Sequence, residues 1–204
     1  MKSIELKGAV REIDSRSSVQ AKALRNMRQV GDVPCVLYGG KEIVHFTVTD
    51  KSLVKLVYTP NIYVVDLQIE GREPVKAILK DIQFHPVKDN ILHVDFLEIT
   101  EEKPIIMDVP VKLEGLAVGV KAGGKLGLQL RKLRVKAPYT VIPDRLVIDV
   151  TKLAIGKTIK VGELNYEGLE ILNAKEAVVC AVRLTRAARG LAAAGEEAAS
   201  TEEA

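Results

Sequence analysis

The residues with the clearest chemical potential are three cations spaced along one short segment. Lys22, Arg25 and Arg28 recur at every third position. In a helix such positions drift by only about 60° per step, so the three side chains form one basic stripe. No acidic residue lies between Arg16 and Val30, whereas a solvated helix face usually mixes both signs. The stripe predicts a surface for a polyanion, and the solvated face of a surface helix is the alternative.

A glycine-rich segment, residues 119–126, comes within one residue of a phosphate-binding loop. Its last position is Leu126, where that loop needs a Ser or Thr hydroxyl for Mg²⁺. The following residues, up to Val135, alternate as in a strand, whereas a phosphate-binding loop leads into a helix. A glycine-rich β-turn explains the segment better than a nucleotide site. The chain also has no Gly-x-Ser-x-Gly elbow, so nothing in the sequence predicts an enzyme.

The three histidines suggest metal binding as a second chemistry. His45 stands alone in a predicted strand, where we expect a half-buried or surface side chain. His85 and His93 are eight positions apart, and Asp95 would complete a set of two histidines and one carboxylate. The helix-borne or Cys-paired spacings of specific metal motifs are missing. We therefore expect no metal and no cofactor.

Short strands must position these residues, because the first hundred residues mostly alternate or form brief apolar runs. The predicted strands are residues 4–10, 35–38, 45–48, 62–69, 74–79 and 91–96. The apolar run 35–38 stops at Gly39-Gly40, which is typical of a hairpin turn, and we expect Val36 to face the core.

The last of these strands has a clean period of two. Leu92, Val94 and Phe96 share one face, which we expect to pack in the core. His93 and Asp95 share the other face. They are polar groups on a rigid strand, so they either bind a ligand or form an ordinary surface hydrogen bond.

Two short helices interrupt the strands. The first is predicted from Gln20 to Val30, with a stop at Gly31. Its apolar residues lie near one stripe, namely Ala23, Leu24, Met27 and Val30. The second begins at Thr49 or Asp50 and ends before Pro60. We expect it to bury Leu53, Leu56 and Val57.

The chain of 204 residues has room for two ordinary domains, with an aliphatic core, since aromatic residues are 4% and Trp is absent. The charged, proline-punctuated segment 101–104 indicates a boundary. We expect domains at 1–98 and 99–186. The second domain has further alternating segments, which predict an antiparallel sheet or roll. Residues 187–204 have too few large apolar side chains for a core, so we expect a disordered Ala/Glu-rich tail.

Charge and apolar patterning restrict partners and location. No apolar run approaches the ~20 residues needed to span a bilayer, and the N-terminus lacks the apolar stretch of a signal peptide. We therefore expect a cytoplasmic protein without a membrane partner.

Cys35 and Cys180 are expected to be small buried hydrophobes. The net charge is +3, but residues 1–186 carry +6, and residues 1–41 hold eight basic and four acidic side chains.

Three segments in this order resemble one ribosomal protein family. The first is residues 22–41, a basic helix followed by the pattern Gly-x-Val-Pro-x-Val-x-Tyr-Gly, and the others are Asp81-Ile-Gln-Phe-His-Pro86 and Leu92-His-Val-Asp-Phe96. The chain resembles the bacterial large-subunit protein L-twenty-five in its long form, also called the Ctc or general stress type. The resemblance covers the chain up to about Arg189.

The resemblance implies a mainly β (α+β) protein: a six-stranded β-barrel-like domain with short helices, then a β-roll-like domain. It also implies a structural constituent of the large subunit that binds the loop E region of 5S rRNA in the central protuberance. Further partners would be 23S rRNA and neighbouring ribosomal proteins. The RNA-binding residues carried over are Arg11, Lys22, Arg25, Arg28, Tyr38, Lys41, His85, His93 and Asp95.

Three positions depart from the family pattern and bear on affinity. Ala21 stands in a segment that usually reads Gly-Lys-Gly or Gly-Lys-Lys, Leu24 replaces Ser or Thr, and Asn26 replaces a second basic residue. The alternative from another class is a β-rich protein-interaction module that docks an acidic partner. Strong salt dependence and nuclease sensitivity would distinguish an RNA partner from that alternative.

Overall fold

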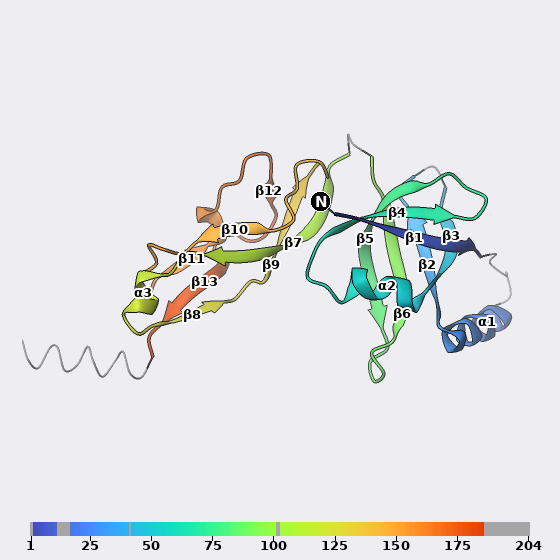
Figure 1. Ribbon diagram of the computed structural model, residues 1–204, viewed down its shortest axis with the longest axis horizontal. Helices are drawn as coiled ribbons and strands as arrows, with labels where there is room; N and C mark the ends of the chain where they lie inside the picture. Colours follow the sequence, from blue (N-terminus) through green and yellow to red (C-terminus); the bar gives the residue numbers. More distant parts are fainter. Residues whose placement is uncertain (1, 12–16, 41, 101–102, 186–204) are drawn as a thin grey trace, which may run out of the picture. The chain divides into compact units, whose positions relative to one another are not determined.

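The structure, a computed structural model, describes residues 2–11, 17–40, 42–100 and 103–185 (Figure 1). It divides into two compact units. Unit 1 comprises residues 1–107 and 137–144, and unit 2 comprises residues 108–136 and the chain from 145 onward. Within the described residues, no helix is both long and apolar enough to cross a membrane.

Six strands of unit 1 form a closed barrel in the order β1-β3-β2-β6-β5-β4. Their bounds are β1 (Lys2–Val10), β2 (Asp32–Tyr38), β3 (Val44–Thr49), β4 (Tyr63–Ile69), β5 (Val75–Phe84) and β6 (Ile91–Glu98). Four neighbouring pairs are antiparallel, while β1 pairs with β4 and β2 pairs with β6 in parallel. The prediction of a mainly β protein with a six-stranded barrel is confirmed.

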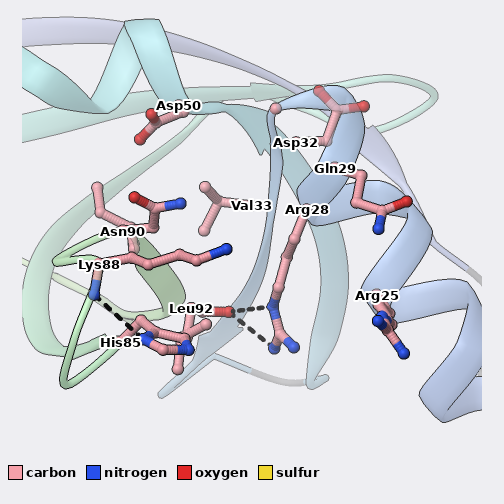
Figure 2. A pocket seen from close by; sticks show the side chains of 12 residues that line it. Arg25, Arg28, Gln29, Asp32, Val33, Asp50, His85, Lys88, Asn90 and Leu92 are labelled. Carbon is pink, nitrogen blue, oxygen red and sulfur yellow. Dashed lines mark hydrogen bonds between the residues drawn. The ribbon is translucent and has the colours of Figure 1, made fainter.

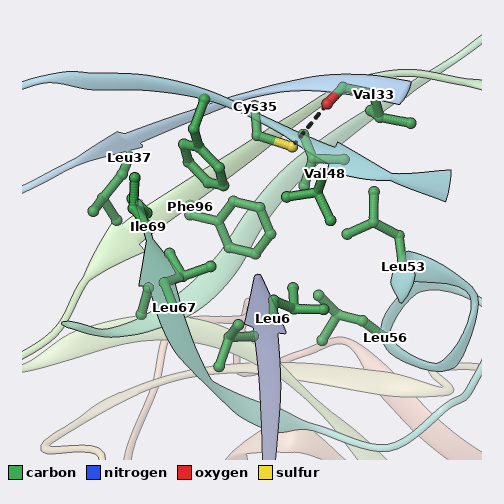
Figure 3. Close-up of a cluster of buried hydrophobic side chains, with 14 of the residues drawn as sticks. Leu6, Val33, Cys35, Leu37, Val48, Leu53, Leu56, Leu67, Ile69 and Phe96 are labelled. Carbon is green, nitrogen blue, oxygen red and sulfur yellow. Dashed lines mark hydrogen bonds between the residues drawn. The ribbon is translucent and has the colours of Figure 1, made fainter. Parts of the chain in front are cut away.

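The barrel core is aliphatic apart from two phenylalanines, as the composition predicted. Phe46 and Phe96 are fully buried, with ring centroids 5.8 Å apart. Cys35 is buried as well, and burial is the main cause that raises the pKa of its thiol to about 12. Leu53 and Leu56 point from α2 (Asp50–Val57) into the same cluster (Figure 3). The second predicted helix is therefore confirmed, with Val57 only partly buried.

Helix α1 (Ser17–Val30) begins three residues earlier than predicted and stops where expected. Gly31 has a φ of +97° and donates its N–H to the Met27 carbonyl at 3.1 Å, a typical glycine C-terminal cap. The predicted apolar packing is only half right. Leu24 and Met27 are half-buried, whereas Ala23 is exposed and Val30 is 81% exposed. The helix contacts β2, and within residues 21–30 every side chain except Leu24 and Met27 is exposed.

Val36 does not face the core, which corrects its prediction. The buried neighbours in β2 are Cys35 and Leu37, and Val36 is half-buried on the outer face. A continuous apolar run does not reveal which positions face inward. In β6 the alternation was informative: Val94 and Phe96 are fully buried, while Leu92 is only half-buried.

Unit 2 contains two small sheets, with strand orders β10-β7-β9-β12 and β11-β13-β8. The strands are β7 (Ile105–Glu114), β8 (Lys125–Leu128), β9 (Lys132–Ala137), β10 (Leu146–Asp149), β11 (Thr158–Lys160), β12 (Glu170–Ile171) and β13 (Val178–Arg183). The short helices are α3 (Val118–Lys121) and the 3-10 turn η1 (Val161–Glu163). β7 and β10 pair in parallel, which the predicted antiparallel arrangement did not include. Cys180 is fully buried, as expected.

Candidate nucleic-acid interface

Polar side chains lie side by side on the outer face of the barrel, across β3, β2, β6 and β5. Val36 pairs in register with His45 on one side and with Asp95 on the other. Asp95 is also opposite Asp81, and His93 is opposite Gln83. Since directly paired residues share a face, these side chains form one surface. We call it the polar strand face and define it as His45, Asp81, Gln83, His93 and Asp95.

His93 and Asp95 contact each other within this face. The Nδ1 of His93 lies 2.7 Å from Oδ1 of Asp95, and the side chains are 25% and 31% exposed. The carboxylate holds the imidazole in one orientation with the proton on Nδ1, so Nε2 is left for another partner. The prediction that these two residues share the face opposite the core agrees with their partial exposure.

Arg11 and His45 add two buried polar atoms without hydrogen-bond partners among the described residues. The backbone N–H of Arg11 donates to the carbonyl of His45 at 2.9 Å. The Arg11 Nε and the His45 Nδ1 are both buried and unpartnered. Burial, then the nearby Arg11 and His93, lower the pKa of His45, so the imidazole is neutral near pH 7. An unsatisfied buried polar group costs about 1–3 kcal/mol, which a bound ligand would recover.

The end of α1 is attached directly beside this face. Nε and Nη2 of Arg28 both donate to the carbonyl of Leu92, at 3.1 and 3.0 Å (Figure 2). Leu92 immediately precedes His93 in β6. The basic stripe of the helix and the polar strand face therefore lie on the same side of the barrel, at least at Arg28.

A pocket at this junction gathers the helix cations with the β5–β6 turn. Arg25, Arg28, His85 and Lys88 line it (Figure 2). Two carboxylates, Asp32 and Asp50, are also among the lining residues, so the pocket is mixed in charge. Its remaining lining residues are Gln29, Gly31, Val33, Asn90, Ile91 and Leu92.

His85 organises the turn that presents Lys88. Its Nδ1 accepts the backbone N–H groups of Val87 and Lys88, at 3.2 and 3.3 Å. Its own backbone N–H donates to Asn90 at 2.8 Å, and Asp89 adopts a positive φ of 53°. An Nδ1 that accepts hydrogen bonds must be unprotonated. The proton is then on Nε2, which is a donor available to a ligand.

The structure does not bring all predicted residues together. Lys22 is exposed on α1 and is not among the residues that line the pocket with Arg25 and Arg28. Tyr38 is half-buried two positions after Val36 in β2, beside the polar strand face, and burial, then Asp95 and Asp81, raise the pKa of its hydroxyl. Lys41 lies outside the described residues, so its predicted role is untested.

The sequence did not predict His45, Asp81 and Gln83 of the polar strand face, nor Lys88 of the pocket, as site residues. His45 was treated as an isolated histidine, although it alternates with the core positions Val44 and Phe46. That alternation is the signal for an outward position, but its pairing with Val36 is not visible in one sequence. Lys88 was missed because it lies in a turn, where periodicity carries no information. Among the described residues, no group of three His, Cys, Asp or Glu is arranged to hold a metal.

Comparisons with known proteins match both parts of the chain. Residues 11–96 match the model of the Ribosomal L25p family, and residues 104–186 match the model described as Ribosomal protein TL5, C-terminal domain. The large ribosomal subunit protein bL25 of Bacteroides fragilis is 71% identical over 194 residues, and that of Bacteroides thetaiotaomicron is 69% identical. Each alignment covers 95% of this chain and 98% of the relative.

A more distant relative gives the same result. The large ribosomal subunit protein bL25 of Porphyromonas gingivalis is 55% identical over 193 residues, which cover 94% of this chain and 98% of that protein. The resemblance inferred from the residue patterns is confirmed. The chain belongs to the Ribosomal L25p family and carries the TL5 C-terminal domain in addition.

Proposed function

We propose that this protein is a structural constituent of the large ribosomal subunit and binds 5S rRNA at its loop E region in the central protuberance. Its relatives are named as proteins of that subunit. The observation that carries the RNA interface is the double hydrogen bond from Arg28 to the Leu92 carbonyl. It holds the end of a basic helix beside a strand face with unpartnered buried polar atoms.

The geometry suits double-helical RNA better than a small ligand. Such RNA is recognised mainly by its shape, through phosphates and 2′-hydroxyls in the wide minor groove. Arg25 and Lys88 are exposed and supply charge for phosphates. Arg28 uses two of its five N–H donors on Leu92 at most, so the others are available to phosphate oxygens.

The polar strand face supplies the neutral contacts in this proposal. Nε2 of His93 is oriented by Asp95, and Nε of Arg11 has no partner among the described residues. Both suit 2′-hydroxyls or base edges. We propose no enzymatic activity for the protein, because the role proposed for these groups is to hold a macromolecule in place.

The test is the Arg25→Ala/Arg28→Ala double variant in a gel shift with 5S rRNA and tRNA as competitor. Each charge-assisted contact is worth roughly 1–3 kcal/mol, so we expect affinity to fall by about 30-fold or more. The matched control is Lys7→Ala/Lys76→Ala, which removes the same charge from exposed positions of β1 and β5. It should bind nearly as wild type does.

Three outcomes would contradict the proposal. The first is wild-type affinity in the Arg25/Arg28 double variant, which would remove α1 from the interface. The second is equal loss in the control, which would mean that only net charge matters. The third is tRNA competing as well as unlabelled 5S rRNA. A protein partner, the alternative class, predicts that nuclease treatment leaves the interaction intact.

A further inference from the structure

The two units divide the charge of the protein unequally. Residues 1–107 and 137–144 carry fifteen basic and sixteen acidic side chains, a net charge of −1. Residues 108–136 and 145–185 carry thirteen basic and seven acidic side chains, a net charge of +6. The barrel has a local basic stripe on a nearly neutral body. The strongly basic body is unit 2, for which the proposed function assigns no contact.

Four cations of unit 2 gather at one end of the sheet β11-β13-β8. β8 begins at Lys125 and β13 ends at Arg183, and the two residues are directly opposite in antiparallel register. The carbonyl of Lys157 accepts the N–H of Val182 at 3.1 Å, which places Lys157 on the other side of β13 at the same end. Lys121 ends α3, four residues before Lys125. We call these four exposed residues the basic sheet end.

The charges of this sheet are separated along its length. Glu163 follows the C-terminal end of β11 and Glu176 precedes β13, so both acids belong to the opposite end. Asp149, near the start of α3, has its carboxylate hydrogen-bonded to Thr151. Within the described residues, none of the four cations of the basic sheet end forms an ion pair. Like charges placed directly opposite on a sheet are unfavourable, and an anion would relieve this cost.

The glycine-rich segment that resembles a phosphate loop explains how these cations are held. A Cβ at Gly124 would lie 2.5 Å from Cγ1 of Val182, and one at Gly119 would lie 2.7 Å from the backbone of Ala154. The two glycines therefore let the α3–β8 turn pack directly on β13. The hydroxyl of Thr185 closes the arrangement by donating to the carbonyl of Gly123 at 2.6 Å. The segment positions two lysines on a rigid support.

We propose that the basic sheet end is a second RNA-binding surface, which contacts phosphates of large-subunit rRNA other than 5S rRNA. The class of partner rests on the proposed function, which places the protein in a ribonucleoprotein. The position of the proposed surface is argued only from residues of unit 2. Four cations that form no ion pair with any residue that the structure describes favour an extended polyanion, because affinity for a nucleic acid grows with each phosphate neutralised.

The test uses the full chain with the Lys125→Gln/Arg183→Gln double variant, and a transcript of 23S rRNA as probe. We expect affinity at low salt to fall about tenfold or more and the log–log salt slope to decrease by about 1–2, since each lost contact removes roughly 0.7–0.9. Binding of 5S rRNA should be unchanged. The matched control is Arg131→Gln/Lys132→Gln, which removes one Arg and one Lys from exposed positions in or beside β9.

Unchanged affinity of the double variant for the transcript would overturn the proposal, and so would an equal loss in the control. A loss of affinity for polyglutamate without a loss for RNA would also overturn it, in favour of an acidic protein partner. If the double variant does not fold by circular dichroism, Lys121→Gln/Lys157→Gln replaces it, because these residues do not pair across strands. The Arg25→Ala/Arg28→Ala variant tests 5S rRNA binding independently of the basic sheet end. Its result therefore shows whether the proposed function fails or only the proposal of a second RNA-binding surface.

Discussion

At the scale of single residues, the candidate interface is held in shape before any ligand binds. Asp95 orients His93, the turn after β5 orients His85, and the Leu92 carbonyl orients Arg28. Side chains already fixed by internal contacts lose less conformational freedom on binding. Arg11 and His45 are the exceptions, because each keeps a buried atom without a partner among the described residues. The environment of His45, which includes Arg11, makes the stability of the fold depend on pH.

We predict that His45 makes the free energy of unfolding depend on pH. Burial, Arg11 and His93 lower its pKa below 6.5 in the folded state, so the unfolded state binds more protons as the pH falls through that value. The stabilising contribution is therefore present above the unfolded pKa and is lost below it. We expect His45→Gln to lose less stability than wild type between pH about 7 and about 5.5. Urea denaturation at both pH values measures this, and parallel losses would contradict it.

Residue types alone identified part of the interface. His93 and Asp95 were found because they alternate with the core positions Val94 and Phe96. Arg28 was found from helical spacing, but its contact with Leu92 joins residues 64 positions apart, which no local pattern encodes. Val36 was misplaced because every residue of its run is apolar.

At the scale of elements, the barrel depends on two aromatic rings and on α2. Phe46 and Phe96 fill its centre, and Leu53 and Leu56 extend the cluster from α2. Individual strands were predictable from short apolar runs and alternation. Their order was not, because the parallel pairs β1–β4 and β2–β6 join strands far apart in sequence. β5 also continues to Phe84, beyond its predicted end, through residues without a clear period and past a register shift near Lys80.

Phe46 is a fully buried position at which the contribution of the barrel core to stability can be measured. Phe46→Ala should reduce the free energy of unfolding of the barrel by about 3–5 kcal/mol, because it leaves a cavity at a fully buried position. Val54→Ala, at an exposed position of α2, is the control and should change it by about 0.5 kcal/mol or less. Denaturant titration followed by circular dichroism measures both. Similar losses in the two variants would show that Phe46 is not a core residue.

At the scale of the whole molecule, the two units have separate roles in our proposals. All residues proposed to contact 5S rRNA lie between positions 11 and 95, within unit 1. The domain boundary predicted near residue 98 stays a prediction. The structure divides the chain near residue 107, and it assigns residues 137–144 to unit 1 as well. Composition alone does not indicate that this later segment belongs to the first unit.

A fragment of residues 1–107 provides the test at this scale. We expect it to bind 5S rRNA within about threefold of the full chain, which corresponds to roughly 0.6 kcal/mol. It should melt at a lower temperature, because it lacks Ile142, which is 2% exposed in unit 1. Gel shifts and thermal melts measure the two effects. A large loss of affinity in a folded fragment would assign part of the 5S rRNA contact to unit 2.

The parallel pairing of β1 with β4 also affects how the protein is made. The ribosome synthesises β1 first, but its longest partner begins at Tyr63. At roughly 5–20 residues per second, the edge of β1 that pairs with β4 waits about 3–10 s for its partner. Glu5 and Lys7 alternate with the apolar Ile4 and Leu6, and charges of this kind discourage edge-to-edge association. The first strand therefore carries its own protection against aggregation during translation.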